Sequence, residues 1–279
     1  MKLRSLLFVP GDRPERMEKA LGLGADALIL DLEDSVTPAS KPVARNAISA
    51  FLRSADRRVK LLVRINPLDS GLSDADLEAV LDARPDGLVL PKAEGSRSIA
   101  LLDGKTDLPI LPIATETPAA IFEIGSYRSV GARLVGITWG AEDLPAAIGA
   151  TTSRDERGQL TQPYELARSL TLFGAHAAGV AAIETVYPDF RDLEGLSAYA
   201  GRASRDGFTG MMAIHPSQVA VINDAFTPSS AEIARAREIV AAFAANPDRG
   251  ALQIDGKMVD APHLKQARRV LSFADDTAQ

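Results

Sequence analysis

The sequence of 279 residues contains no cysteine, which excludes disulfide bonds, thiolate metal sites and a cysteine nucleophile. Its three histidines, His176, His215 and His263, are scattered, and no two have the spacing of a metalloprotease zinc motif. No apolar run reaches the roughly 18 residues that a membrane-spanning helix needs, and the net charge of −6 argues against a broad nucleic-acid-binding surface. These absences predict a cytoplasmic protein with neither nucleic acid nor membrane as a partner.

The composition is that of an ordinary globular protein, with 46% hydrophobic and 24% charged residues. The length permits one α/β barrel or two small domains. The first ten residues superficially resemble a signal peptide, but their apolar part is too short and Pro10-Gly11-Asp12 offers no small-residue cleavage site. We therefore interpret this segment as the first strand of the fold.

Short apolar segments alternate with helical patterns along the chain. The predicted strands are residues 3–9, 25–30, 59–65, 86–90, 109–113, 134–138, 180–183 and 210–214. The predicted helices are residues 14–21, 39–51, 74–81, 96–102, 163–178 and 192–204. This order predicts a TIM (β/α)8 barrel. A doubly wound open sheet is the alternative, but it would usually carry a glycine-rich phosphate loop after the first strand, and residues 10–14 lack that fingerprint.

The C-terminal part of the chain lies beyond the predicted closure of the barrel. We expect a catalytic barrel domain over residues 1–225 and a C-terminal extension over residues 226–279. The extension reads as a helix, a hairpin with Asp255-Gly256 as its turn, and a last helix from Pro262. Such an extension can serve as a lid, an oligomer contact, or both.

Two acids follow neighbouring predicted strands. Glu116 follows residues 109–113, and Thr117 and Pro118 then have the pattern of a helix N-cap and first helical residue. Asp143 follows residues 134–138 in the same way. Ligands bind at this end of the strands in parallel α/β proteins, so Glu116 and Asp143 are predicted to hold a hard cation such as Mg²⁺. The alternative is that both are surface acids favoured by helix dipoles.

Further charged residues stand at the ends of the predicted strands. Arg64 interrupts an apolar strand, which favours a role in gripping a substrate carboxylate over pairing with Asp31 or Glu33. The Asp31, Glu33 and Asp34 group favours supporting and capping roles over metal ligation. Lys92 can form a Schiff base or pair with Glu116, and we favour the ion pair.

Two other residues of the predicted barrel mouth have less specific signals. His215 precedes a proline at the end of the last strand, where a lone histidine is more often a hydrogen-bonded terminator than a base. Trp139 is the only tryptophan, and we expect it to pack near the mouth.

Several short motifs occur together in a fixed order. They are the segments 4–11 (RSLLFVPG), 30–36 (LDLEDSV), 63–66 (VRIN), 90–92 (LPK), 114–117 (ATET), 140–144 (GAEDL) and 214–218 (IHPSQ). In this register the chain resembles the citrate lyase β-subunit-like (CitE-like) proteins of the HpcH/HpaI aldolase superfamily, which include malyl-CoA and citramalyl-CoA lyases. The resemblance covers essentially the whole chain, including the segment 256–263 (GKMVDAPH).

The resemblance implies a carbon–carbon lyase that splits a 3-hydroxyacyl-CoA thioester into a 2-keto acid and an acyl-CoA. It places Mg²⁺, or Mn²⁺ in its stead, on Glu116 and Asp143, and catalysis on Arg64 and Asp260. Substrate binding falls to Arg64 with Glu33, Asp31 and Lys92. It also implies a homotrimer, or a dimer of trimers, in which the C-terminal extension covers the site of a neighbouring subunit.

The CoA thioester would need a basic surface for its phosphates. Arg13, Arg16 and Lys19 follow the first strand and can supply one, or can form an ordinary solvated helix face. Two alternative functions remain beside the lyase. One is a citrate lyase β subunit acting on an acyl-carrier-protein thioester, and the other is a non-catalytic keto-acid binder.

Overall fold

The computed structural model describes residues 2–55 and 58–277 and divides into two compact units, Leu3–Asn223 and Asp224–Gln279. The strands of the first unit are β1 (Ser5–Pro10), β2 (Ala27–Asp31), β3 (Lys60–Arg64), β4 (Gly87–Leu90), β5 (Ile110–Pro112), β6 (Gly136–Ile137), β7 (Ala181–Glu184) and β8 (Gly210–Ala213). The α-helices up to residue 225 are α1 (Pro14–Ala20), α2 (Lys41–Ser54), α3 (Ser73–Val80), α4 (Gly95–Ala100), α5 (Pro118–Glu123), α6 (Asp143–Ile148), α7 (Gln162–Ala178), α8 (Leu193–Asp206) and α9 (Gln218–Ala225). Short 3₁₀ helices are η1 (Pro38–Ser40), η2 (Leu81–Ala83) and η3 (Ile124–Arg133).

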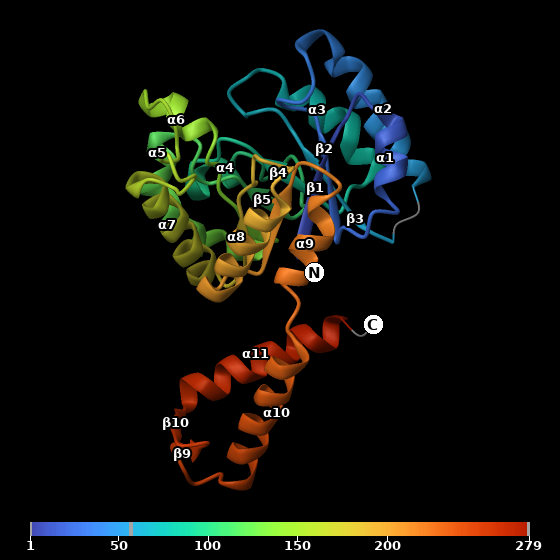
Figure 1. The fold of residues 1–279 in the computed structure, drawn as a ribbon. Coiled ribbons are helices and arrows are strands. Elements are labelled where there is room, and N and C mark those ends of the chain that lie inside the picture. Colours follow the sequence, from blue (N-terminus) through green and yellow to red (C-terminus); the bar gives the residue numbers. More distant parts are fainter. Residues whose placement is uncertain (1, 56–57, 278–279) are drawn as a thin grey trace. The chain divides into compact units, whose positions relative to one another are not determined.

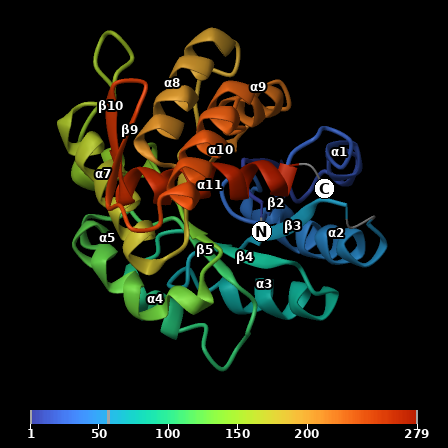
Figure 2. The same cartoon turned by 90° about the horizontal axis from the view of Figure 1, so that it is seen from below.

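The strands of the first unit form one parallel sheet in the order β5-β4-β3-β2-β1-β8-β7-β6. Its two ends meet, because Ile110 bridges to Leu134 and Ile113 to Thr138. The main-chain N–H of Ala114 donates to Thr138 at 2.9 Å across this seam. Helices surround the strands (Figure 2). The predicted TIM barrel is therefore confirmed, and the open sheet is not the fold.

The strands close into a barrel because their side chains are buried on both faces, as parallel strands require. All five residues of β2 are buried. The inward-facing side chains form the barrel core, whose members are Leu3, Leu6, Ala27, Ile29, Leu62, Val89, Leu111, Ile113, Ile183 and Met212. Thr117 caps α5 as predicted, since its side chain accepts a hydrogen bond from the main-chain N–H of Ala120 at 3.1 Å.

Some elements differ from the sequence prediction. Strands β5 and β6 have only three and two residues, because the chain there is held mainly by the isolated bridges of the seam. The helices η3 and α9 were not predicted. The segment of η3 contains two glycines and lacks the 3.6-residue apolar repeat that identifies an α-helix.

The second unit contains α10 (Ser230–Ala245), β9 (Ala251–Ile254), β10 (Lys257–Asp260) and α11 (Ala261–Thr277). Ser229 and Glu232 form a capping box at the start of α10. The strands pair as the predicted hairpin, and the positive φ angles of Asp255 and Gly256 (49° and 76°) turn the chain between them. Helices α10 and α11 lie side by side (Figure 1). Across residues 2–55 and 58–277, no helix has both the length and the apolar surface needed to cross a membrane.

Candidate active site

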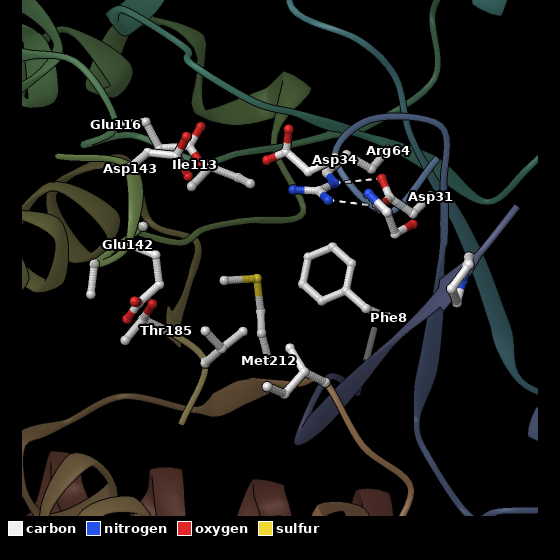
Figure 3. A pocket seen from close by; sticks show the side chains of 16 residues that line it. Phe8, Asp31, Asp34, Arg64, Ile113, Glu116, Glu142, Asp143, Thr185 and Met212 are labelled. Atoms are coloured by element: carbon white, nitrogen blue, oxygen red, sulfur yellow. Dashed lines mark hydrogen bonds and ion pairs between the residues drawn. The ribbon is translucent and has the colours of Figure 1, made fainter. Parts of the chain in front are cut away.

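A pocket of about 430 Å³ opens at the carboxyl ends of the barrel strands. Its charged residues end or follow β2, β3, β5 and β6 and are Asp31, Asp34, Arg64, Glu116, Glu142 and Asp143 (Figure 3). We call this side, with Glu33 and Lys92 beside it, the charged half. The pocket is also lined by Phe8 of β1, Met212 of β8, and Val186 and Ile214, which follow β7 and β8. We call these four residues the apolar half.

Arg64 lies at the end of β3, where the strand register places it beside Asp31 of β2. Its Nε donates to Asp31 Oδ1 at 2.6 Å and its Nη2 to Oδ2 at 2.7 Å. Its Nη1 lies 2.7 Å from Glu33 Oε2 without hydrogen-bond alignment. The guanidinium also stacks over Phe8, with Cζ 4.7 Å from the ring centroid. Arg64 thus makes the acid contacts proposed as the alternative and still faces the pocket.

The contacts of Arg64 leave part of its hydrogen-bonding capacity unused. A guanidinium has five N–H groups. Asp31 accepts one from Nε and one from Nη2, and Glu33 forms an ion pair with Nη1. Among the described residues, one N–H on Nη1 and one on Nη2 remain for a substrate carboxylate. Asp31 cannot take this role itself, because it is buried with both oxygens on Arg64.

The ionisation of this group follows from burial and pairing. Burial opposes the charge of Asp31, but the hydrogen bonds from Arg64 outweigh it and hold the pKa of Asp31 below its ordinary value. Burial raises the pKa of Glu33 despite the nearby Arg64 and Lys92. Burial likewise opposes the charge of Arg64, but its acidic partners raise the pKa of the guanidinium further. The guanidinium therefore stays charged, which suits the binding of an anion.

Lys92 follows β4 and contacts three acids. Its Nζ donates to Glu33 Oε1 at 2.9 Å and lies 3.2 Å from Asp143 Oδ1. Its main-chain N–H donates to Glu116 Oε2 at 2.6 Å. The predicted ion pair with Glu116 is therefore wrong, because the ammonium pairs with Glu33 and Asp143 and only the main chain of Lys92 contacts Glu116. The partners changed because the main chain of Lys92, with a φ of 50°, turns its N–H toward Glu116.

Glu116 and Asp143 lie near each other at the ends of β5 and β6 (Figure 3). Burial, followed by the charge of Asp143, raises the pKa of Glu116 to about 8. Gly140 makes room for Glu116, because a Cβ at this position would lie 2.8 Å from Glu116 Cγ. Two carboxylates that repel each other in a buried site are stabilised by a cation between them.

The donor set fits a hard divalent cation that keeps much of its water. In residues 2–55 and 58–277 there is no group of three or more His, Asp or Glu side chains arranged as a metal site. Mg²⁺ is commonly held by one or two carboxylates, with water and substrate completing the octahedron. Glu116 and Asp143 match that description, whereas a zinc site would require more protein ligands.

A buried hydrogen-bond network supports the apolar half of the mouth. Glu184 accepts hydrogen bonds from Trp139 Nε1 (2.5 Å), Thr185 N (2.9 Å) and Tyr199 OH (3.2 Å). Its other oxygen accepts from Arg168 Nε at 2.6 Å. This carboxylate is fully used in fixing the ends of β6 and β7. Trp139 is fully buried beside Glu184.

Comparison with known proteins places this chain in a family. The sequence profile described as HpcH/HpaI aldolase/citrate lyase matches residues 4–216. The chain belongs to this family. The predicted resemblance is thereby confirmed, and so is the prediction of a carbon–carbon lyase at the level of the HpcH/HpaI family.

Individual relatives of the HpcH/HpaI family match nearly the whole chain. A mitochondrial citramalyl-CoA lyase from Rattus norvegicus is 36% identical, over 97% of this chain and 86% of the relative. A (3S)-malyl-CoA thioesterase from Cereibacter sphaeroides is 36% identical, over 99% of this chain and 95% of the relative. The crystal structure of CitE from Mycobacterium tuberculosis with magnesium, acetoacetate and coenzyme A is 36% identical, with a TM-score of 0.85 and 98% of each chain covered.

The remaining predicted residues lie outside the pocket lining. Arg13, Arg16 and Lys19 are exposed on or next to α1. Asp260 belongs to the second unit, where its Oδ1 lies 2.6 Å from His263 Nδ1. His215 interacts with Ser217 Oγ at 2.8 Å and stacks on Phe190, as the strand-terminator interpretation expects.

Sequence reasoning missed the apolar half. Phe8 and Met212 read as ordinary members of buried strands, and nothing in their chemistry marks them. The two-residue alternation of a strand was the available signal, because Met212 and Ile214 share one face at the end of β8 and its continuation. The inward-facing residue nearest the carboxyl end of β8 is Met212, and this reasoning would have placed it at the mouth.

Proposed function

We propose that the protein cleaves a 3-hydroxyacyl-CoA thioester into a 2-keto acid and an acyl-CoA, or catalyses the reverse condensation, with Mg²⁺ as its cofactor and Mn²⁺ as a substitute. The observation that carries this proposal is that one pocket contains both the paired acids Glu116 and Asp143 and the partly engaged Arg64. A relative of similar fold binds magnesium, acetoacetate and coenzyme A, and these are the classes of ligand that the reaction requires.

In this reaction the protein groups have separate roles. Glu116 and Asp143 hold the cation, which when bound would polarise the keto carbonyl. Arg64 donates its remaining N–H groups to the carboxylate of the keto acid and offsets developing negative charge. Asp31, Glu33 and Lys92 contribute to substrate binding by fixing Arg64 and the two acids. A carboxylate moves the proton at the α-carbon of the thioester, and we assign this step to Asp260.

The apolar half favours a keto acid with an alkyl substituent. A keto acid held by Arg64 and the two acids presents its carboxylate and carbonyl to the charged half. Its substituent then faces Phe8 and Met212, where a methyl group can be buried and a charged group cannot be stabilised. Citramalyl-CoA, which yields pyruvate, fits this arrangement better than malyl-CoA, which yields glyoxylate.

A substrate panel tests the reaction. Purified protein is incubated with Mg²⁺ and citramalyl-CoA, malyl-CoA or 3-hydroxy-3-methylglutaryl-CoA, and the products are identified. Pyruvate and acetyl-CoA from citramalyl-CoA are expected. Free acid and CoA without C–C cleavage would instead indicate hydrolysis, the activity named for one relative. No turnover of any thioester, with keto acid still bound, would support a non-catalytic binder.

The exposed Arg13, Arg16 and Lys19 support the binding of the CoA phosphates. All three are on or next to α1, which follows β1 at the carboxyl end of the barrel. Glutamine at the three positions should weaken CoA binding in a salt-dependent way and leave keto-acid affinity unchanged. Equal loss of both affinities would contradict this assignment.

The protein is further proposed to form a homotrimer, alone or as a dimer of trimers, in which the second unit covers a neighbouring site. Two phenylalanines of the first unit are largely exposed, Phe122 on α5 (88%) and Phe173 on α7 (66%). Met258, two residues before Asp260, is 69% exposed. We propose these side chains as contact residues of the oligomer, and a cyclic arrangement closes heterologous contacts into a ring.

Subunit mixing tests whether Asp260 acts on a neighbour. Asp260→Ala and Glu116→Gln are each expected to be inactive. If sites are shared, exchanged oligomers contain some sites with an intact barrel and an intact Asp260, and activity returns. If mass spectrometry verifies exchange and activity stays at the level of the parents, action on a neighbouring subunit is wrong.

A further inference from the structure

Lys92 contacts both proposed metal ligands through different groups. Its main-chain N–H donates to Glu116 Oε2 at 2.6 Å, and its ammonium lies 3.2 Å from Asp143 Oδ1. The main-chain contact depends on a φ of 50°, a left-handed conformation that a residue with a Cβ adopts at a cost. The backbone and the side chain of one residue are therefore both directed at the metal site.

The ammonium of Lys92 occupies a position that conflicts with a bound cation. A divalent ion held by Glu116 and Asp143 would be close to a positive charge already paired with Asp143. In a partly buried site such like charges repel strongly, because little water screens them. Lys92 must therefore either oppose the metal or move when it binds.

The structure provides a second partner for the ammonium. Lys92 Nζ also donates to Glu33 Oε1 at 2.9 Å, and Glu33 is buried. When the contact with Asp143 breaks, the ammonium keeps this carboxylate and is not left unpaired, which would be strongly unfavourable. Asp143 is the more exposed of the two carboxylates, so its contact is the easier to exchange.

We infer that Lys92 is a positioning residue that serves as an internal counter-ion of the metal site. Its main-chain N–H fixes Glu116 at all times, while its ammonium holds Asp143 in the metal-free protein and gives it up to the cation, retaining Glu33. This inference rests on the proposed function, because it takes Glu116 and Asp143 as the metal ligands.

The sign of a change in Mg²⁺ affinity distinguishes this role from a structural one. Lys92→Met removes the competing charge and keeps a side chain of similar length on the same backbone. Isothermal titration without substrate should show Mg²⁺ binding about tenfold tighter than in the wild type. A lysine that merely holds the site together predicts the opposite result, because its loss would disorder the ligands and weaken binding.

Matched variants complete the experiment. Lys105→Met removes the same charge from an exposed ion pair with Asp74 and should leave Mg²⁺ affinity within about twofold of the wild type. Lys92→Arg keeps the charge and should not tighten binding. Lys92→Gln replaces the methionine variant if that protein does not fold.

The outcomes separate this inference from the proposed function. Unchanged or weaker Mg²⁺ binding by a folded Lys92→Met or Lys92→Gln protein would overturn the counter-ion role and leave the metal site standing. If the wild type binds no Mg²⁺, or Glu116→Gln binds it as well as the wild type, the metal assignment is wrong and the role of Lys92 falls with it.

Discussion

The two halves of the barrel mouth are built in different ways. In the charged half, side chains from consecutive strands hold one another. Arg64 is fixed by Asp31 and Glu33, and Lys92 bridges Glu33 and Asp143. The apolar half has no such contacts between its members. Phe8 and Met212 are held there by the packing of the barrel core beneath them.

This difference separates orientation from selection. Hydrogen bonds and ion pairs have preferred directions, so the charged half can orient a carboxylate and a carbonyl. Packing has no such direction, so the apolar half can only accept or exclude a substituent by size and polarity. Substitutions in the charged half should therefore abolish the reaction, whereas substitutions in the apolar half should change which substrate is used.

The largest effect is expected for Glu116→Gln, which removes one of the two proposed metal ligands and keeps the shape of the side chain. Turnover should fall by at least about a thousandfold, since the loss of metal binding removes the polarisation of the carbonyl. Calorimetry should show a parallel loss of Mg²⁺ affinity. Glu142→Gln removes an exposed carboxylate from the same pocket and should lower turnover less than about tenfold. Equal effects of the two variants would contradict the assignment of Glu116 as a metal ligand.

A smaller effect is expected for Arg64→Lys. A lysine keeps the positive charge but cannot contact Asp31, Glu33 and a substrate carboxylate together, because it lacks the planar array of donors. The value of kcat/KM should fall roughly a hundredfold, which corresponds to a loss of transition-state stabilisation of about 3 kcal/mol. Arg64→Ala should cost at least as much, and keto-acid affinity should fall in both. Near-normal affinity and turnover in the alanine variant would show that the carboxylate binds elsewhere.

The sequence was sufficient to place Asp31, Arg64, Glu116 and Asp143 at the mouth of the barrel. Arg64 and Glu116 could be located because each is a charged group at the end of an apolar run, where a parallel barrel places its ligands. The pairing of these groups was not predictable. The ammonium of Lys92 contacts Glu33 and Asp143 instead of Glu116 because of a left-handed backbone and the closure of the sheet, and neither is visible in residue order.

The apolar half could not be predicted from residue type. Phe8 and Met212 have the same pattern as the core residues below them, since alternation assigns a face of the strand but not a height along the barrel. The position of a residue along the barrel axis depends on where its strand ends. The shortness of β5 and β6 shows that such ends were located to within only a few residues.

A third prediction concerns the pH dependence of the charged half without metal. The pKa of Glu116 is raised to about 8 from its ordinary value of 4.5, chiefly by burial. The folded state therefore binds a proton that the unfolded state has lost, and stability falls as pH rises between these two values. From about pH 5.5 to about pH 7 the loss should be about 2 kcal/mol, at roughly 1.4 kcal/mol per pH unit. Glu116→Gln has no titrating carboxyl at this position, so its stability should not show this loss.

The measurement compares the free energy of unfolding of wild type and Glu116→Gln in the presence of a chelator at several pH values. The variant should become progressively more stable than the wild type as pH increases. Parallel curves would mean that Glu116 titrates normally and that neither burial nor the charge of Asp143 raises its pKa.

The smallest effect is expected in the apolar half, from Met212→Gln. Pyruvate and glyoxylate share the carboxylate and carbonyl that the charged half binds, and they differ by one methyl group. Burying that methyl group against Met212 is worth about 1 kcal/mol, so the wild type should prefer pyruvate by about fivefold in affinity. A glutamine amide at this position should reduce the preference to about twofold or less, because it favours water over a methyl group. Met212→Leu conserves the apolar character and should keep the preference.

Binding of both keto acids is measured by calorimetry with Mg²⁺, together with the unfolding temperature of each variant. Loss of affinity for both acids to the same extent would show that Met212 supports the whole site and does not select the substituent, and the separation of orientation from selection would then not hold.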